Sequence, residues 1–368
     1  MALLAMKTRF LAVLLSLLLL AACGGQAAPA SSPSSPPAGS AAAPASGASA
    51  KPASASGAAA AKPSGQATKL VASYGELVPQ SLPVWFAKDS GIFEQNGLDV
   101  DLRLIVSSAE VAALVAGDTQ LASSGGPIVL SAVSAGADLV VTAGIAVLSP
   151  FALYTPPSIN SVPELKGKAL GVSKFGSPSD IALKIALRKF GIDPSKDVRF
   201  VELGSTQART AALIQGTIQG GMANPLEANT LEKNGLHAIY DMAKDKQPSA
   251  QSVIVSKRDW VAGHRDVMQR YIDSIAQTMI KVRQDKPRAI AVMKRWFKSD
   301  DEQLMTRVYD QYTSTGLWPT VPSATPEMFA DAKEIISATD PKMKDYDLSK
   351  LIDSSFVKSA EERGLTKG

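Results

Sequence analysis

Short apolar segments alternate with amphipathic segments from residue 67 onward, and this pattern favours an α/β fold with mainly parallel sheets. A further strand is predicted at 252–256, and from residue 265 to the end apolar residues recur at helical spacing. We expect this helical segment to pack back on the first part of the fold. The other predicted strands fall into two sets, at 70–73, 100–106, 120–123 and 139–145, and at 169–173, 198–203, 220–223 and 237–240.

The two sets of strands belong to an internal repeat. Segment 113–120 (ALVAGDTQ) matches 212–219 (ALIQGTIQ), and each predicts a helix end, a C-terminal glycine and a new strand. Segment 71–75 matches 172–176 in the same way. We therefore expect two similar lobes, with residues 67–155 and 250–368 in lobe 1 and residues 156–249 in lobe 2. The chain would cross between them near 153–160 and near 245–253.

The carboxyl ends of the predicted strands indicate where a ligand binds, because their loops lead into helix N-termini. In both lobes these loops carry serines and glycines before helices with recognisable caps, such as the capping-box pattern of Ser107 and Glu110. Exposed N–H groups and hydroxyls at helix N-termini suit an anion. A serine before a helix is usually only a cap, so the hypothesis depends on corresponding positions in both lobes. We expect a pocket rich in donors and poor in acceptors.

Four aromatic residues near these loops are candidates to cover the rest of a ligand, namely Tyr74, Trp85, Phe151 and Phe175. Each of them can instead pack in the core. Tyr74 and Phe175 occupy equivalent positions in the repeat, so we favour these two as ligand contacts.

The N-terminal segment predicts export. Lys7 and Arg9 precede an apolar run that ends at Ala22, which is too short for a membrane span and typical of a signal peptide over residues 1–22. The run leads into Cys23, the only cysteine, in a context that resembles the bacterial lipobox, so lipidation of Cys23 is expected. A plain signal peptide with an incidental Cys23 is the alternative. Residues 23–66 are rich in Ala, Ser and Pro and predict a disordered tether.

Charge argues against nucleic acid as a partner. The chain has 38 Lys and Arg against 34 Asp and Glu, but Lys7, Arg9, Lys51 and Lys62 precede residue 67 and no acidic residue does. The folded part is therefore balanced, whereas nucleic-acid binders usually carry a basic excess or stripe.

Three segments carry a resemblance to a known family: 82–93 (LPVWFAKDSGIF), 97–100 (GLDV), and 162–168 (VPELKGK) leading to Gly171 and Val172. They resemble the periplasmic substrate-binding proteins of ABC importers for nitrate, sulfonates, taurine and thiamine pyrimidine precursors. The resemblance spans residues 68–358. It implies a type II periplasmic-binding-protein fold, in which two lobes, each a mostly parallel sheet flanked by helices, close on a solute. Together with Phe175 from the repeat, the ligand contacts it implies are Tyr74, Ser108, Ser124, Gly125, Ser177 and Asn224.

We therefore expect an extracytoplasmic solute-binding lipoprotein that delivers an organic sulfonate or carboxylate to an ABC permease and its ATPase. It would act as a monomer, held through Cys23 at the outer face of the bacterial cytoplasmic membrane or in the periplasm. Charged or histidine side chains of the kind that nitrate binders use do not occur at the matching loops. A pyrimidine-precursor binder, with Glu76 and Glu227 as the nearest acidic candidates, and a solute-binding sensor module are alternatives.

An enzyme is the remaining class, because fungal relatives of this family make a pyrimidine from their own histidine. The chain contains only His237 and His264, which are predicted at a strand start and a helix start rather than on pocket loops. No nucleophile, phosphate-loop or metal-ligand motif occurs in the sequence. We expect no catalytic residue, no metal and no cofactor.

Overall fold

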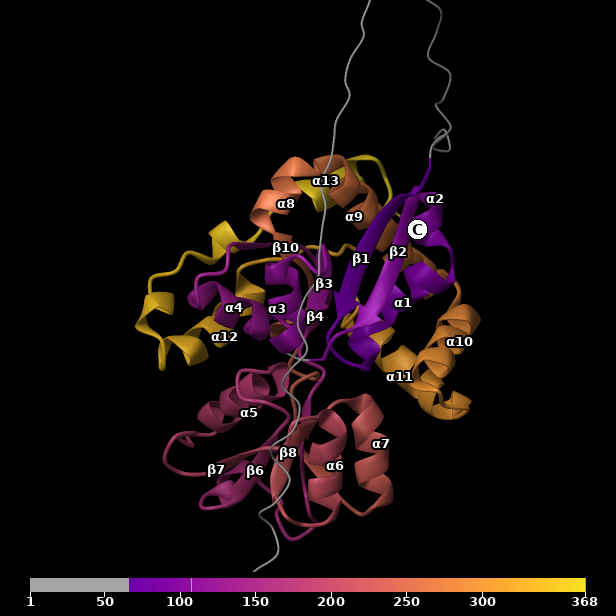
Figure 1. Ribbon diagram of the computed structural model, residues 1–368. Helices are drawn as coiled ribbons and strands as arrows, with labels where there is room; N and C mark the ends of the chain where they lie inside the picture. Colours follow the sequence, from indigo (N-terminus) through magenta and orange to yellow (C-terminus); the bar gives the residue numbers. More distant parts are fainter. Residues whose placement is uncertain (1–65, 107, 368) are drawn as a thin grey trace, which may run out of the picture. The chain divides into compact units, whose positions relative to one another are not determined.

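The computed structural model describes residues 66–106 and 108–367 (Figure 1). The predicted signal peptide, Cys23 and all but the last residue of the predicted tether lie outside the described residues. No helix in the described part has the length and apolar character to cross a membrane.

The described chain forms strands, helices and short 3-10 helices in alternation. The strands are β1 (Thr68–Tyr74), β2 (Leu98–Leu104), β3 (Leu121–Ser124), β4 (Leu139–Leu148), β5 (Ala152–Thr155), β6 (Ala169–Val172), β7 (Arg199–Glu202), β8 (Gly220–Ala223), β9 (His237–Asp241) and β10 (Pro248–Lys257). The α-helices are α1 (Leu82–Asp89), α2 (Ile92–Gln95), α3 (Ser108–Ala116), α4 (Gly126–Ser134), α5 (Pro178–Lys189), α6 (Thr206–Ile214), α7 (Pro225–Lys233), α8 (Arg258–Gly263), α9 (Arg265–Gln284), α10 (Lys286–Phe297), α11 (Glu302–Thr315), α12 (Glu327–Ser337) and α13 (Ser355–Glu362). The 3-10 helices are η1 (Pro79–Ser81), η2 (Val162–Leu165), η3 (Pro341–Met343) and η4 (Leu348–Leu351).

The strands form two five-stranded sheets with the same topology. The sheet of lobe 1 has the order β2-β1-β3-β10-β4, and the sheet of lobe 2 has the order β7-β6-β8-β5-β9. In each sheet the first three strands are parallel, and the fourth, β10 or β5, is antiparallel to both of its neighbours. Every predicted strand is present, and the expectation of two similar lobes is confirmed.

Apolar side chains cover both faces of each sheet. On one face of the first sheet, α1, α2 and α9 to α11 pack around Leu70, Val100 and Val140, and on the other α3, α4 and α12 pack around Ala122 and Val253. The second sheet lies between α5 on one face and α6 with α7 on the other (Figure 1). The predicted packing of the helical C-terminal segment on lobe 1 is confirmed.

Glycines end the repeated helices where the repeat predicts them. Gly117 follows α3 with φ of 89°, and Gly216 follows α6 with φ of 71°. This left-handed conformation is strained for residues with a Cβ, so glycine allows the chain to leave the helix and enter the next strand at equivalent places in both lobes.

The crossovers between the lobes lie earlier in the chain than predicted. The chain leaves β4 at Leu148 and enters the second sheet at Ala152, because Ala152–Thr155 pairs with both β8 and β9. The prediction of a crossover at 153–160 is therefore wrong. The return crossover lies between Asp241 of β9 and Pro248 of β10, so it overlaps only the start of the predicted segment 245–253. The lobe boundaries at 155/156 and 249/250 stay a prediction.

Candidate functional site

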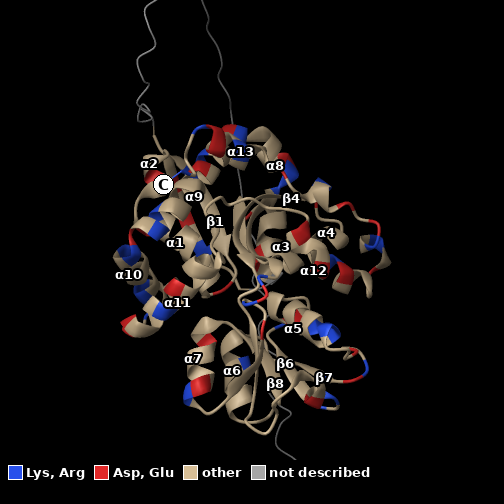
Figure 2. Cartoon of the chain, turned by 180° about the vertical axis from the view of Figure 1, so that it is seen from behind, with Lys and Arg blue, Asp and Glu red and all other residues tan. Residues whose placement is uncertain are grey.

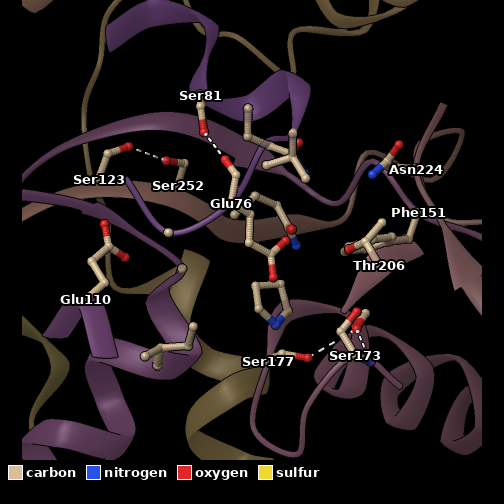
Figure 3. A pocket seen from close by; sticks show the side chains of 18 of the residues that line it. Glu76, Ser81, Glu110, Ser123, Phe151, Ser173, Ser177, Thr206, Asn224 and Ser252 are labelled. Atoms are coloured by element: carbon tan, nitrogen blue, oxygen red, sulfur yellow. Dashed lines mark hydrogen bonds between the residues drawn. The ribbon is translucent and has the colours of Figure 1, made fainter. Parts of the chain in front are cut away.

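A polar pocket of about 60 Å³ lies where the carboxyl ends of strands from the two sheets face each other (Figure 3). Both lobes form its wall, which satisfies the sequence expectation that loops at strand ends of both repeats meet at one place. The lining residues are Gly75, Glu76, Val78, Gln80, Ser81, Glu110, Ser123, Gly125, Ile128, Phe151, Ser173, Ser177, Pro178, Ser179, Thr206, Arg209, Asn224, Gln251 and Ser252.

Glu110, on the first turn of α3, is the most buried carboxyl group of the pocket wall. Its side chain is fully buried, and neither carboxyl oxygen has a hydrogen-bond partner among the described residues. Gly75 packs against it so closely that a Cβ at position 75 would lie 2.7 Å from Glu110 Oε2. Burial raises the pKa of Glu110 well above its usual range, and the nearby hydroxyls of Ser124 and Ser73 offset only part of this rise. Glu110 therefore favours its neutral form and lines the pocket, while its predicted capping partner Ser107 lies outside the described residues.

Glu76, in the loop after β1, is a second carboxyl group of lobe 1 in the pocket. Burial raises its pKa, Arg209 across the pocket partly lowers it, and Glu227 adds to the rise. Glu76 lines the pocket together with Arg209, which belongs to α6 of lobe 2.

Segments outside the predicted loops complete the lobe 1 wall. The side-chain oxygens of Gln80 on η1 and Gln251 on β10 are buried without a hydrogen-bond partner in the part of the chain that the structure describes. Ser252 of β10 and Ser123 of β3 share a hydrogen bond of 2.9 Å between their hydroxyls. Gln80 and Gln251 therefore leave polar groups that a bound molecule can pair.

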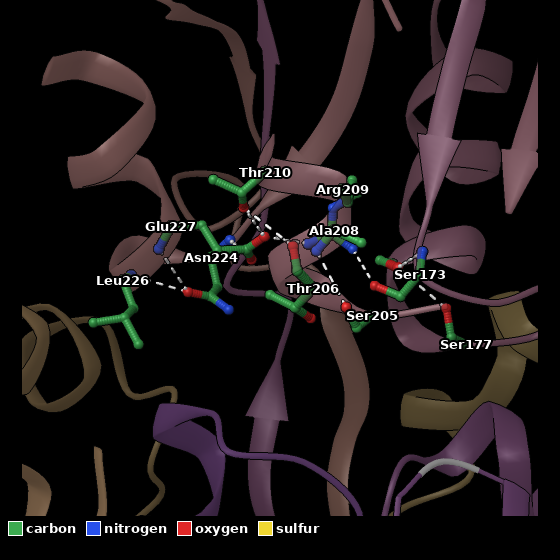
Figure 4. Close-up of polar contacts among 11 residues, drawn as sticks. Ser173, Ser177, Ser205, Thr206, Ala208, Arg209, Thr210, Asn224, Leu226 and Glu227 are labelled. Atoms are coloured by element: carbon green, nitrogen blue, oxygen red, sulfur yellow. Dashed lines mark hydrogen bonds and ion pairs between the residues drawn. The ribbon is translucent and has the colours of Figure 1, made fainter. Parts of the chain in front are cut away.

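A buried ion pair organises the lobe 2 wall (Figure 4). Arg209 of α6 donates from Nη2 to Glu227 Oε1 at 2.5 Å, and the two side chains are only 1% and 7% exposed. Arg209 Nη1 donates to the hydroxyl of Ser173, and Thr210 Oγ1 donates to Glu227 Oε1 at 3.1 Å. The network joins the end of β6 to the starts of α6 and α7.

Asn224 connects this network to the pocket. Its Oδ1 accepts hydrogen bonds from the N–H groups of Leu226 and Glu227 at 2.9 and 3.2 Å, and its own N–H donates to Glu227 Oε2 at 3.0 Å. These bonds form a capping box at the start of α7. The amide Nδ2 of Asn224 is left to face the pocket, beside the hydroxyl-bearing side chain of Thr206.

The β3–α4 loop meets the start of α5 directly at the pocket. A Cβ on Gly125 would lie 2.8 Å from Pro178 Cγ, so glycine permits this close approach of lobe 1 to lobe 2. Ser177, which precedes α5, shares a 3.1 Å hydrogen bond between hydroxyls with Ser179 and makes no capping bond. Its hydroxyl group is therefore not used as the helix cap that the sequence suggests as the alternative.

The structure brings some of the predicted site residues together and separates others. Gly125, Ser177 and Asn224 line the pocket, as does Phe151 among the aromatic candidates. Ser124 is buried outside the pocket lining, close to the Glu110 carboxyl group. The side chain of Ser108 lies outside the described residues. That any of these residues binds a ligand stays a prediction.

The favoured aromatic pair does not line the pocket. Tyr74 is buried against Trp85 and Trp296, with ring centroids 5.6 Å from each, so its place is the core of lobe 1. Trp85 is fully buried in the same cluster and stacks on Trp296 at 5.2 Å. Phe175 is 54% exposed, and its backbone N–H donates to Glu202 Oε2 at 2.8 Å. Equivalent repeat positions therefore do not give equivalent side-chain directions here.

Sequence reasoning named Glu76 only as an acidic candidate for a pyrimidine-precursor binder, and it missed Glu110 and Arg209 as charged groups of the pocket. In the sequence Glu110 fits a capping box, and Arg209 lies a full turn inside α6, outside the loops at the strand ends. The expectation of few acceptors is wrong, since Glu76, Glu110 and two glutamine side chains line the pocket. The repeat contained a signal, because the alignment that places Ala113 opposite Ala212 also places Glu110 opposite Arg209.

Neither histidine lines the pocket. His237 begins β9, and His264 precedes α9, where its ring stacks on Trp260 at 4.8 Å. Among the described residues no cluster of three or more His, Cys, Asp or Glu side chains has the geometry to hold a metal ion.

A family model described as NMT1/THI5-like matches residues 78–289, which is more than half of the chain. The chain belongs to the NMT1/THI5-like family. A comparison with curated proteins gives no significant match. The sequence-based assignment to this family is thus confirmed, and the matched residues include every pocket-lining residue described above except Gly75 and Glu76.

Solved structures share the fold of this NMT1/THI5-like chain. A protein from Bordetella bronchiseptica RB50 is 19% identical with a TM-score of 0.70, covering 81% of this chain and 98% of its own. The periplasmic aliphatic sulphonate binding protein SsuA from Escherichia coli is 19% identical with a TM-score of 0.62, covering 77% and 97%. The desulfurization enzyme DSZB is 15% identical with a TM-score of 0.59, covering 80% and 99%. These likenesses confirm the expected two-lobed fold of periplasmic binding proteins.

Proposed function

We propose that this chain is the extracytoplasmic solute-binding component of an ABC importer, which captures a small organic solute and delivers it to a permease and its ATPase. The observation that carries the proposal is a polar pocket walled by both lobes at the carboxyl ends of their strands. Such an arrangement surrounds a solute with groups from two rigid elements. Direct contacts also join the two lobes, including the ion pair of Arg188 with Glu334 and the hydrogen bond from Arg307 to Asn229.

Membership of the NMT1/THI5-like family and the shared fold of the E. coli periplasmic sulphonate-binding protein support a role in import. The predicted signal peptide and lipidation of Cys23 would place the protein outside the cytoplasm, tethered to a membrane through residues 23–66. A monomer is sufficient for this role, because one chain supplies both walls of the pocket.

We propose a sulfonate or carboxylate as the head group of the solute. Thr206, Asn224 and Ser177 present donors to the pocket. In their neutral forms the Glu76 and Glu110 carboxyl groups can also donate O–H hydrogen bonds, and burial raises the pKa of both groups. An anion bound beside them holds these protons in place, so its affinity falls once the pH rises above the raised pKa of these groups.

A solute with N–H donors, such as a pyrimidine precursor, is a second candidate. The observation in its favour is the unpartnered acceptor set of Glu110, Gln80 and Gln251. Such a solute binds the carboxylate form of Glu110 more tightly than the neutral form, so its affinity rises with pH over the range in which an anion's affinity falls.

A thermal-shift screen of the full chain tests the proposal. Sulfonates, taurine, nitrate, carboxylates, aromatic acids and pyrimidines are compared, because a compound that binds only the native state raises the unfolding midpoint. Affinities of the hits are then measured across pH. A sulfonate or carboxylate whose affinity falls with pH supports the anionic head group, and a pyrimidine whose affinity rises with pH supports the second candidate.

A pocket variant separates specific from general binding. Replacing Thr206 by Val removes one hydroxyl at nearly constant volume and should weaken a hit about tenfold, which corresponds to one hydrogen bond to a charged group. Thr217→Val, outside the pocket lining, is the matched control. No hit in any class contradicts the binding proposal. Permease and ATPase genes beside this one favour transport over a sensor role, which a neighbouring kinase gene would favour.

A further inference from the structure

The pocket is too small for a large solute. On the same measure one water molecule needs about 10–15 Å³, so a pocket of about 60 Å³ has room for a group the size of a few water molecules. A sulfonate, carboxylate or small heterocyclic edge fits this space. The rest of any larger organic solute has to extend out of the pocket.

An apolar groove adjoins the pocket. It measures about 690 Å³ and is formed by α3 and α4 of lobe 1 and by the loop 174–177 of lobe 2. Glu110 is the only charged residue in α3, and α4 has none, so Figure 2 shows these two helices almost without red or blue. Val115 and Phe175 on the groove are 43% and 54% exposed, respectively. Two large side chains of this kind on one surface indicate a site for an apolar group.

The groove and the pocket share a boundary. Ile128 and Ser177 line both of them, one from each lobe. Beyond this shared boundary the loop of lobe 2 stays close to α4, since a Cβ on Gly176 would lie 3.7 Å from Ser131 Oγ. A molecule that passes between Ile128 and Ser177 therefore enters a groove walled by both lobes.

We infer that this groove binds the apolar tail of a solute whose polar head occupies the pocket, so the cargo is an amphiphilic molecule with an alkyl or aryl chain. The inference rests on the proposed function, and it adds the part of the cargo that the polar pocket does not hold. Two observations carry it: the small volume of the pocket and the shared boundary of Ile128 and Ser177.

The internal repeat supplies matched variants for the test. Val115 of α3 and Ile214 of α6 occupy equivalent repeat positions and are 43% and 38% exposed, but only Val115 lines the groove. Val115→Asp therefore places a charge in the groove, and Ile214→Asp places the same charge on the equivalent surface of lobe 2. A second pair, Ala112→Trp and Ala211→Trp, fills the groove or the equivalent surface with a large ring.

The full chain is titrated with straight-chain sulfonates from methanesulfonate to octanesulfonate, and with the corresponding n-alkylamines, by calorimetry. Each methylene that is about half buried should tighten binding about twofold, so octanesulfonate should bind at least tenfold more tightly than ethanesulfonate. Val115→Asp and Ala112→Trp should remove this increase in affinity with chain length, while their affinity for methanesulfonate stays within twofold of the wild type. Ile214→Asp and Ala211→Trp should keep the increase.

The outcomes separate the inference from the function on which it rests. The tail site is overturned if the affinity for the sulfonates does not increase with chain length. It is also overturned if the increase persists in Val115→Asp and Ala112→Trp. Both results leave the proposed function standing. If no member of either series binds, the proposed head-group chemistry and the tail site are both contradicted.

Discussion

Replacing Glu227 by Gln should destabilise lobe 2 severely. The carboxylate is the only ion-pair partner of Arg209 among the described residues, and the two side chains are 7% and 1% exposed. The substitution keeps the shape of the side chain and an oxygen for the N–H of Asn224, but it leaves the guanidinium charge buried without a counter-charge. Breaking a buried pair in this way costs about 3–5 kcal/mol.

Urea unfolding followed by circular dichroism measures this cost directly. The midpoint of thermal unfolding should also fall, by about 5–8 °C, because the shift is the loss of free energy divided by an unfolding entropy of about 2.1 cal/mol/K per residue over about 300 described residues. Glu334→Gln is the control, because its pair with Arg188 is 72% and 38% exposed and should contribute less than about 1 kcal/mol. The double variant Arg209→Leu with Glu227→Leu should be more stable than Glu227→Gln alone, since no unpaired charge remains. A loss in Glu227→Gln no larger than that in Glu334→Gln would refute the reasoning.

Three further predictions follow from the pocket and its surroundings. Because burial raises the pKa of Glu110, this group stabilises the wild type below a pH of about 4.5, and the stabilisation is lost as the pH rises through the raised pKa. Glu110→Gln should therefore flatten this part of the dependence of the free energy of unfolding on pH. An unchanged dependence would show that another group is responsible for it. Ser177→Trp should abolish binding of the best hit from the screen and lower the free energy of unfolding by about 1–3 kcal/mol, because Ser177 is buried and the ring overpacks its site; retained affinity by calorimetry would remove Ser177 from the site. Trp85→Ala should lower the free energy of unfolding by about 3–5 kcal/mol without changing the affinity for that hit, because Trp85 is fully buried against Tyr74 and Trp296. A stable variant that no longer binds would contradict the place of Trp85 in the core.

Much of the fold could be predicted because its strands are short, apolar and separated by capped helices. The repeat alignment also predicted the equivalent topology of the two sheets, since each copy carries the same succession of strand, helix end and glycine. Strand β5 was missed because four residues, Ala152–Thr155, carry little periodic signal and owe their conformation to pairing with β8 and β9. The crossover was misplaced for the same reason.

The site was predicted as a set of loops more reliably than as a set of side chains. Gly125, Ser177 and Asn224 line the pocket because loops at the carboxyl ends of parallel strands converge whatever residues they carry. Side-chain direction depends on packing that the sequence pattern does not contain. Tyr74 turns into the tryptophan cluster of α1 and α10, whereas Phe175, its repeat counterpart, lies on the surface with no such cluster to receive it.

The repeat also explains how one scaffold produces a pocket with two different walls. Glu110 and Arg209 occupy equivalent positions on α3 and α6, and both line the pocket. In lobe 2 the charge is balanced by Glu227 inside the protein, so that wall is fixed before any solute binds. In lobe 1 the Glu110 oxygens have no partner among the described residues, so that wall is completed only by a proton or by a ligand. The affinity of the pocket for its solute should therefore depend on pH through lobe 1, while the integrity of the pocket depends on the ion pair of lobe 2.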